Sequence, residues 1–458
     1  MATSTTAHSG THASPQPAAK FAVPKSASAT PAASPSTAGT AVGLSAAAPT
    51  ATSATQARSA VVMGILAIVL IGLNLRAGIA GASTLFHDLQ AVLGYGPVVA
   101  SFLPSIPTIC FAVAGSATAW LTRRIGVEKA IMLSLALLAG GLLIRGVPST
   151  GMLVIGTVIG MSGLAVCNVA LPALIRQHFP DKTSLMTALY TFSMTTGATA
   201  SSVAMVPLAQ QLGSPSLGIA SLGLFAVVGM VAFLPLLRRG RQSKSGTAQH
   251  VSPWPLLRTR KGALLTAAFT LQALLAYAVM SWFAYILTDQ GLSASDSGLQ
   301  FGLMQLVSVP AGSILIAIGS RQSRLRLAFY LATLTMVVGL AALLVLPIGL
   351  AAVSGVFIGF GLGIFPLIMV MISRSGSSTA ETTALSTLAQ SVGYLLATAG
   401  PFGMGLLHSA TGHWILPLGL LLAVALVQVV VGHVVAGIAP APRTTIGTRS
   451  AATSRSTK

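Results

Sequence analysis

The chain is divided into long apolar blocks, each close to the length that spans a lipid bilayer. An α-helix needs about 20 apolar residues to cross the hydrocarbon layer. Only 7% of the residues are charged, whereas soluble domains carry about 25%. The blocks do not alternate between polar and apolar residues, as barrel strands do. The sequence therefore predicts an all-α integral membrane protein with twelve transmembrane helices, at 60–86, 97–122, 129–147, 151–176, 184–211, 216–237, 262–288, 297–319, 327–347, 350–373, 382–407 and 414–438.

The basic residues support this topology. When both termini are placed in the cytoplasm, 23 of the 25 lysines and arginines fall in cytoplasmic segments and none falls in an outer loop. Lysine and arginine remain on the cytoplasmic side because their translocation is disfavoured. The formal net charge of +19 would suggest nucleic acid in a soluble protein, but here topology accounts for it. We expect a multi-pass protein of the bacterial inner (plasma) membrane whose partners are lipid and a small-molecule substrate, with no nucleic acid.

The chain also divides into two related halves. The segment TALYTFSMTTG at 187–197 matches TALSTLAQSVG at 383–393, at an offset of 196 residues. Repeated halves are typical of transporters, whose substrate site lies near the midplane between them. The predicted parts are a disordered cytoplasmic tail at 1–57, a six-helix bundle at 58–237, a basic cytoplasmic linker at 238–261, a second six-helix bundle at 262–438 and a basic cytoplasmic tail at 439–458. An organellar transit peptide is the alternative for the first of these parts.

One permanent cation, Arg76, lies inside the first apolar block. A central arginine costs about 2.5–3.5 kcal/mol on insertion scales. The six acids lie in predicted loops or at helix ends, so none is placed to pair with Arg76: Asp88, Glu128, Asp181, Asp289, Asp296 and Glu381. An unpaired cation in a cavity suits an anionic or strongly dipolar solute. The alternative is that the side chain snorkels to the outer head groups, an interpretation that fits Arg145 better.

Other polar and aromatic residues on several helices are candidates for substrate binding beside Arg76: Asn74, Asn168, Tyr190, Gln272, Tyr277, Trp282, Gln305, Gln390 and Tyr394. Asn74 lies about 200° from Arg76 around the helix axis, so only one of the two needs to face the cavity. The alternative for the amides is hydrogen bonding between helices. The alternative for the aromatic residues is anchoring at the membrane interface, above all for Trp282 and Trp414.

The loop AWLTRRIGVEKA at 119–130 carries cations at the ends of two helices. We interpret Arg123, Arg124 and Gly126 as a gating loop, because arginine can interact with the carbonyls at a helix C-terminus. Plain topology charges are the alternative. The two cysteines, Cys110 and Cys167, lie within apolar blocks and are expected to be small core residues. No metal ion or other cofactor is expected.

Several short motifs recur in the order seen in a known family. They are Asn74-Leu75-Arg76-Ala77; Gly163, Asn168, Leu171 and Pro172; Phe179 to Asp181; Leu185 to Tyr190; Gln272, Tyr277 and Trp282 with Gly-Leu-Ser at 291–293; and Leu385, Ser386, Gln390, Gly393, Tyr394, Gly400 and Pro401. With them, residues 60–438 resemble the major facilitator superfamily, in its cyanate-transporter and 2-nitroimidazole-transporter branch. The resemblance implies a carrier that works as a monomer.

Two departures from the family pattern concern single residues. Ala77 replaces the family's proline after Arg76, which implies a weaker kink there. The superfamily pattern Gly-x-x-x-Asp-Arg-x-Gly falls on Ala119, Arg123, Arg124 and Gly126. The aspartate is missing, so the family's acidic latch does not carry over.

We therefore expect a secondary transporter that moves a small anionic or polar solute by alternating access. Cyanate-like anions, small carboxylates and nitroheterocycles all remain open. The alternative is a multidrug or toxic-compound exporter of uncharged polar solutes; a sensor built on a carrier fold is less favoured, since no signalling domain is visible. An enzyme is not expected, because the blocks hold no paired acids and no clustered histidines for acid–base chemistry. Coupling through a buried carboxylate is likewise not expected.

Overall fold

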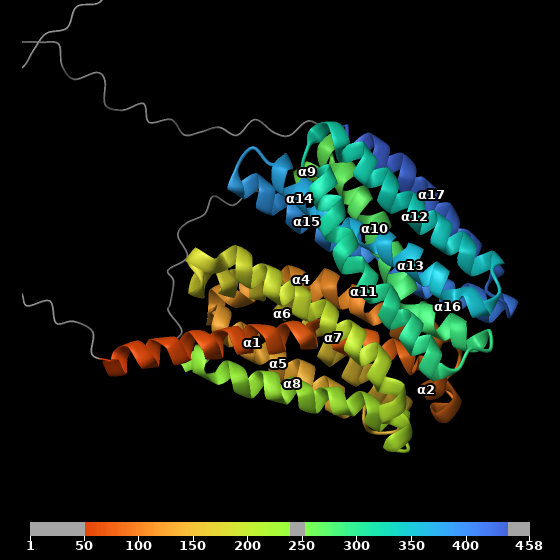
Figure 1. The fold of residues 1–458 in the computed structure, drawn as a ribbon, viewed down its shortest axis with the longest axis horizontal. Helices are drawn as coiled ribbons and strands as arrows, with labels where there is room; N and C mark the ends of the chain where they lie inside the picture. Colours follow the sequence, from red (N-terminus) through yellow and green to blue (C-terminus); the bar gives the residue numbers. More distant parts are fainter. Residues whose placement is uncertain (1–50, 239–251, 438–458) are drawn as a thin grey trace, which may run out of the picture. The chain divides into compact units, whose positions relative to one another are not determined.

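The computed structural model describes residues 51–238 and 252–437, and all its regular elements are helices (Figure 1). The first half comprises α1 (Ala51–Thr84), α2 (Phe86–Leu93), α3 (Pro97–Phe102), η1 (Leu103–Ser105), α4 (Ile106–Ile125), α5 (Val127–Ile144), α6 (Thr150–His178), η2 (Pro180–Lys182), α7 (Thr183–Gln211) and α8 (Pro215–Arg238). The all-α prediction is confirmed.

The second half begins with a four-residue helix and continues with longer ones. It comprises α9 (Trp254–Leu257), α10 (Arg260–Asp289), α11 (Ala294–Gly319), η3 (Gln322–Arg324), α12 (Leu325–Val345), η4 (Ile348–Leu350), α13 (Ala351–Leu362), α14 (Ile364–Ser375), α15 (Thr379–Ala397), α16 (Ala399–Thr411) and α17 (Ile415–Val435). The predicted tails and linker lie largely outside the described residues. Within them, α1 already begins at Ala51, inside the predicted disordered tail, and α9 lies inside the predicted linker.

Ten helical segments of the described chain are long and apolar enough to cross a membrane. Two further long segments, α7 and α15–α16, occupy the places of the fifth and eleventh predicted helices. They are less apolar, and they contain the two copies of the internal repeat. Large apolar side chains such as Leu224 and Val430 are exposed, as expected for helices whose outer faces meet lipid.

The two ends of the helices differ in charge. Arg123 and Arg124 end α4, Lys261 lies in the first turn of α10, and Arg374 lies in the last turn of α14. We call this the basic end. The short helix α2 lies at the opposite end, where α1 finishes (Figure 1).

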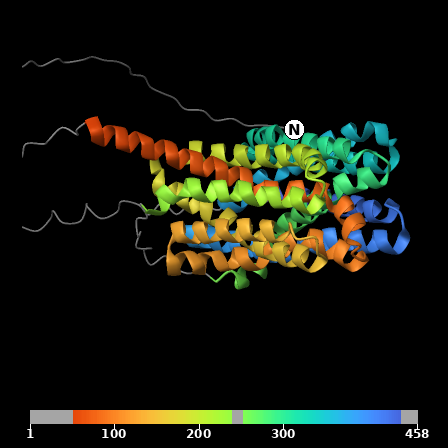
Figure 2. The same cartoon turned by 90° about the horizontal axis from the view of Figure 1, so that it is seen from below.

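Side chains join the two halves towards the opposite end. The hydroxyls of Thr108 and Thr398 lie 3.1 Å apart. Ser281 of α10 donates to the carbonyl of Pro104 in η1 at 3.2 Å, and Tyr285 donates to Gln90 Oε1 at 3.1 Å. The helices run side by side (Figure 2), with α4 against α15 and α7 against α11. The hydroxyls of Ser116 and Ser391, 2.7 Å apart, add a contact between the halves that lies closer to the basic end.

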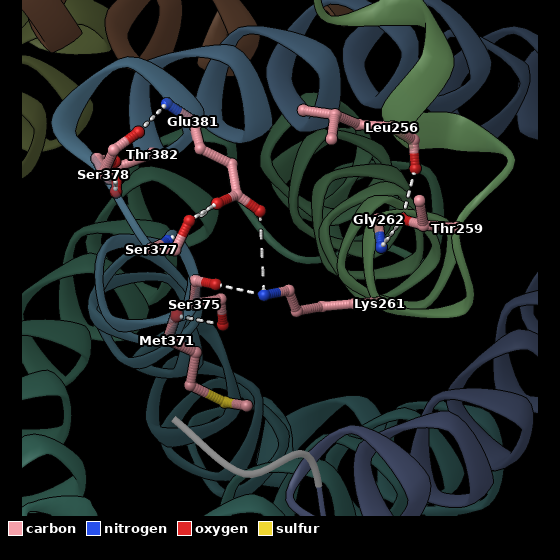
Figure 3. Close-up of polar contacts among 10 residues, drawn as sticks. All are labelled: Leu256, Thr259, Lys261, Gly262, Met371, Ser375, Ser377, Ser378, Glu381 and Thr382. Carbon is pink, nitrogen blue, oxygen red and sulfur yellow. Dashed lines mark hydrogen bonds and ion pairs between the residues drawn. The ribbon is translucent and has the colours of Figure 1, made fainter. Parts of the chain in front are cut away.

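At the basic end, a polar cluster fixes the start of α15 (Figure 3). Ser378 caps the helix, accepting a hydrogen bond from the Glu381 amide at 3.1 Å. The Glu381 carboxylate accepts from the amide of Ser377 at 2.8 Å and from its hydroxyl. Lys261 donates to the Ser375 carbonyl and lies 3.8 Å from Glu381 Oε1. We call these contacts the Glu381 clasp, since they connect α10, α14 and α15.

Candidate functional site

Arg76 lies on α1 and reaches towards the other half of the molecule. Its side chain is half-buried, and Nη1 lies 3.6 Å from the sulfur of Met280 on α10. A thioether is only a weak acceptor, and no carboxylate in the described chain forms an ion pair with Arg76. The guanidinium therefore points between the halves, with most of its donors unused.

Three tyrosines from three helices surround this cation. Tyr190 of α7, Tyr277 of α10 and Tyr394 of α15 are all close enough to Arg76 to interact with it electrostatically. All three were predicted as candidates from the sequence. Because α7 belongs to the first half, and α10 and α15 to the second, the group spans both halves.

Aromatic rings pack around two of these tyrosines. The rings of Tyr277 and Tyr394 meet edge to face at 5.8 Å. Phe269 lies 5.0 Å from the Tyr394 ring, and Phe111 lies 5.1 Å from the same ring and 6.0 Å from Tyr277. We call these four residues the aromatic cluster. Phe111 and Phe269 were not predicted, because a phenylalanine in an apolar block does not differ in sequence from a core residue.

A glycine sets the distance between α1 and α7. Gly72 and Arg76 are four residues apart and share one face of α1. A Cβ atom at Gly72 would lie 2.9 Å from the Tyr190 carbonyl and 2.8 Å from Ser193 Cβ. Only glycine allows this approach without a shift of the helices, and it brings the Tyr190 backbone next to the face that carries Arg76.

Two predicted candidates lie away from Arg76. Asn74 is buried and its amide donates to the carbonyls of Leu70 at 2.8 Å and Phe225 at 3.4 Å, so it ties α1 to α8. Trp282 is 3% exposed and donates to the Pro401 carbonyl at 2.8 Å. Trp414 is also buried and donates to Asp289 at 2.7 Å. Anchoring of the two tryptophans in the lipid interface is therefore wrong.

The remaining amides form no hydrogen bond with Arg76 in the described chain. Gln390 is half-buried and donates to the Ser386 hydroxyl at 2.8 Å. Asn168 is half-buried, and Gln272 and Gln305 are buried. The Oε1 atom of Gln305 has no hydrogen-bond partner. These four residues stay predictions.

The predicted gating loop is exposed at the basic end. Arg123 and Arg124 are exposed, and the Arg124 guanidinium lies 4.7 Å from the Trp120 ring centroid. Gly126 ends α4 with a φ of 88°, a conformation that favours glycine. The loop's buried polar contact belongs to Glu128, which sequence reasoning missed. Its carboxylate lies 2.8 Å from His178 Nε2 and accepts from Gln177 at 2.9 Å.

Arg145 does not snorkel to the membrane surface, so that prediction is wrong. It is 1% exposed, and its Nε and Nη1 atoms have no hydrogen-bond partner. The turn after α5 is packed tightly, because a Cβ atom at Gly146 would lie 2.7 Å from Ala220 Cβ of α8. The side chain therefore lies inside the first half instead of extending to the head groups.

The described part of the chain contains no group of histidine, cysteine and acidic side chains that could hold a metal ion. Cys110 and Cys167 are both buried and unpaired, as predicted. The site can offer a cation, phenol hydroxyls and aromatic faces. Such groups bind and orient a solute.

Comparisons with known proteins agree with this geometry. Residues 68–401 match the family model of the Major Facilitator Superfamily. The chain is 31% identical to the uncharacterized transporter YycB of Bacillus subtilis strain 168, over 80% of this chain and 91% of that protein. It is 29% identical to the 2-nitroimidazole transporter of Escherichia coli K12 (77% and 89%) and 25% identical to the cyanate transport protein CynX of the same organism (77% and 91%).

The fold is also found among solved structures. A structure of the nucleoside transporter NupG superposes with a TM-score of 0.70 over 81% of this chain and 99% of that one. The sequence identity is 9%, so this likeness concerns the fold alone.

Proposed function

The chain belongs to the major facilitator superfamily, in the branch of the cyanate and 2-nitroimidazole transporters, and from this premise we propose what it carries and how. As a member of this family it is a membrane protein that transports small solutes, and it is not an enzyme. We propose a secondary transporter whose solute carries an anionic or strongly dipolar group bound by Arg76.

The observation that carries this proposal is the unpaired Arg76 guanidinium between the halves. Coulomb attraction is several-fold stronger in a low-dielectric interior than in water. A cation without a carboxylate partner is therefore stabilised by a negative group that binds next to it. Tyr190, Tyr277 and Tyr394 supply hydrogen bonds around that group and adjust the fit to its shape.

The aromatic cluster supports a planar solute. Only 6% of the chain is aromatic, yet four aromatic rings pack together, and two of them, Tyr277 and Tyr394, interact electrostatically with Arg76. Aromatic faces and edges stack well on flat rings. This favours nitroheterocycles and small planar anions, and one relative is named for 2-nitroimidazole. An exporter of uncharged planar polar solutes is the second candidate, and the same cluster favours it.

Contacts between the halves support a mechanism of alternating access. The contacts of Thr108 with Thr398 and of Ser281 with Pro104 lie towards the opposite end. We propose that the basic end faces the cytoplasm and that the structure is closed to the outside. The six acids all lie within a helical turn of a helix end or in η2 or α2, so coupling does not use a buried carboxylate beside Arg76.

A thermal-shift panel on purified protein in detergent tests the proposal. Cyanate, nitrite, small carboxylates, 2-nitroimidazole and neutral amides are compared on wild type, Arg76→Gln and Arg123→Gln. At a concentration 100 times Kd, a ligand stabilises the folded state by about 2.7 kcal/mol. We expect one anion class to stabilise wild type, with affinity about 10- to 100-fold weaker in Arg76→Gln because a charge-assisted hydrogen bond is lost. The exposed Arg123→Gln variant should bind like wild type.

Stabilisation by uncharged compounds alone would contradict the anion carrier. If only uncharged compounds stabilise the protein, and equally in Arg76→Gln, Arg76 is a structural residue. The exporter of uncharged solutes then replaces the anion carrier.

A further inference from the structure

A small cavity lies beside Arg145, away from the aromatic cluster. Its walls come from α1, η1, α5, α6 and, across the halves, α10; the residues used below are Gly78, Ser83, Pro104, Arg145, Thr157 and Ser281. Its free space is enough for about one water-sized particle. It can therefore hold only a small occupant in this conformation.

The hydroxyl groups that line the cavity all donate hydrogen bonds to backbone carbonyls. Ser83 donates to Ala80 at 2.8 Å, Thr157 donates to Leu153 at 2.6 Å, and Ser281 donates to Pro104 at 3.2 Å. No carboxylate lines the cavity. The free polar hydrogens around this space are therefore those of the Arg145 guanidinium.

The Arg145 guanidinium is buried without a counterion. Its Nε and Nη1 atoms have no hydrogen-bond partner, and the residue is 1% exposed. A buried charge that is left uncompensated is strongly destabilising. The ionisable group with which Arg145 interacts electrostatically is Tyr95, a phenol that donates to the Phe86 carbonyl at 2.9 Å. Nothing in the cavity's described surroundings balances the positive charge.

The cavity lies further along α1 than Arg76, towards the opposite end. Gly78 and Ser83 follow Arg76 on α1 by two and seven residues, or about 3 and 10 Å along the helix axis. Ser281 follows Met280, the residue that Arg76 contacts. The bond from Ser281 to Pro104 joins the two halves over the cavity. Separation of the halves at this end would break that bond and uncover Arg145.

We propose that Arg145 binds a small monovalent anion in this cavity. We further propose that this is a second anion-binding site, on the outer side of Arg76, along the route of the solute. Its place on that route rests on the proposed function. The occupant is a halide-sized inorganic ion or the anionic group of the solute itself. The binding chemistry is the same for both: charge-assisted hydrogen bonds from a guanidinium in a site that excludes water.

Halide titration of the purified transporter tests the site. Chloride, bromide and nitrate are compared with gluconate, which is too large to enter, at equal ionic strength. We expect the small anions to raise the melting temperature of wild type by about 2 °C or more. The rise should persist in the exposed control Arg123→Gln. Because Arg76 is itself proposed to bind an anion, the two sites are separated in the Arg76→Gln background: a rise should remain in Arg76→Gln and be lost in Arg76→Gln/Arg145→Gln. An equal rise in the double variant and in Arg76→Gln, or no rise in Arg76→Gln, overturns the proposal.

A second measurement covers the case in which Arg145→Gln does not fold. Wild-type crystals grown in bromide are measured at the bromine absorption edge. An anomalous peak next to the Arg145 guanidinium is expected, and the absence of a peak there overturns the proposal.

Two further comparisons distinguish the two possible sources of the anion and test the two proposals independently. If bromide weakens binding of the transported solute more in wild type than in Arg145→Gln, the solute's own group occupies the Arg145 site; additive stabilisation by bromide and solute identifies an inorganic ion. If Arg76→Gln binds all solutes like wild type, the proposed function fails. The halide titration still tests the Arg145 site independently of that outcome.

Discussion

At the residue scale, the two arginines inside or next to apolar blocks have different environments that the sequence shows only in part. Arg76 was predicted to reach a cavity because it is far from both ends of its block, and the structure brings it to Met280 across the halves. Arg145 was assigned to the head groups because it lies at the end of its block. Sequence distance to a helix end cannot show whether the turn is covered, and here α8 covers it.

Trp282 gives a prediction at the same scale. Its indole donates to the Pro401 carbonyl from a buried position, so Trp282→Phe should leave that carbonyl unsatisfied. We expect the free energy of unfolding to fall by about 1–3 kcal/mol, with solute affinity unchanged. Thermal unfolding and solute titration check this, with the exposed Trp254→Phe as the matched control. Loss of solute affinity without loss of stability would show instead that Trp282 contributes to solute binding.

At the element scale, the Glu381 clasp shows what a local pattern can and cannot predict. The spacing of Ser378 and Glu381 is a capping-box pattern and is visible in the sequence. The contacts of Lys261 with Glu381 and Ser375 are not, because they depend on how α10 packs beside α14 and α15. The same holds for the aromatic cluster: its tyrosines could be predicted, but its phenylalanines became visible only when α4, α10 and α15 were placed together.

The clasp predicts a pH dependence of stability. The hydroxyl of Ser377, then its amide and the charge of Lys261, lower the pKa of Glu381 below its usual 4.5. A carboxylate whose folded pKa is lower than its unfolded pKa stabilises the fold above the unfolded pKa, and this contribution is lost as the pH falls through the folded pKa. Glu381→Gln should therefore lower the melting temperature at pH 7, and the difference from wild type should shrink below about pH 4.5.

Melting curves between pH 3 and pH 8 measure this difference. Asp181→Asn, at an exposed acid of η2, is the control and should show no such loss. A constant difference between Glu381→Gln and wild type across the range would mean that the carboxylate's charge does not stabilise the clasp.

At the scale of the whole molecule, the contacts that join the halves predict a lock. The hydroxyls of Thr108 and Thr398 lie 3.1 Å apart, so cysteines at both positions can form a disulfide after modest adjustment. In a background without Cys110 and Cys167, Thr108→Cys with Thr398→Cys should oxidise and hold this end closed. Solute transport into proteoliposomes should fall at least about 10-fold and recover with reductant, whereas each single-cysteine variant stays active. Full transport by the cross-linked protein would contradict the rocking of the two halves.

The overall architecture was predictable because block length and charge position are properties of the chain alone. Prolines mark the breaks within spans. The eleventh predicted helix divides at Thr398, three residues before Pro401, and the tenth divides at Gly363, three residues before Pro366. Proline cannot donate the backbone hydrogen bond that would continue the helix, so the sequence AGPFGMG at 399–405 already predicts a bend there.

The modest apolarity of α7 and α15–α16 has a consequence for how the protein is made. Ten segments are apolar enough to enter the bilayer by themselves, and these two are not among them. Each becomes stable in lipid only when partners cover its polar face, and α15 finds partners in α10 and α4. During synthesis, α4 is translated long before α15, so the second copy of the repeat inserts into a membrane that already contains its partners. The first copy, α7, contacts α1 and α8 in the first half, and its contact with α11 forms only after the second half is made. The transporter's assembly is therefore ordered in time, with its final docking delayed until the second half has been translated.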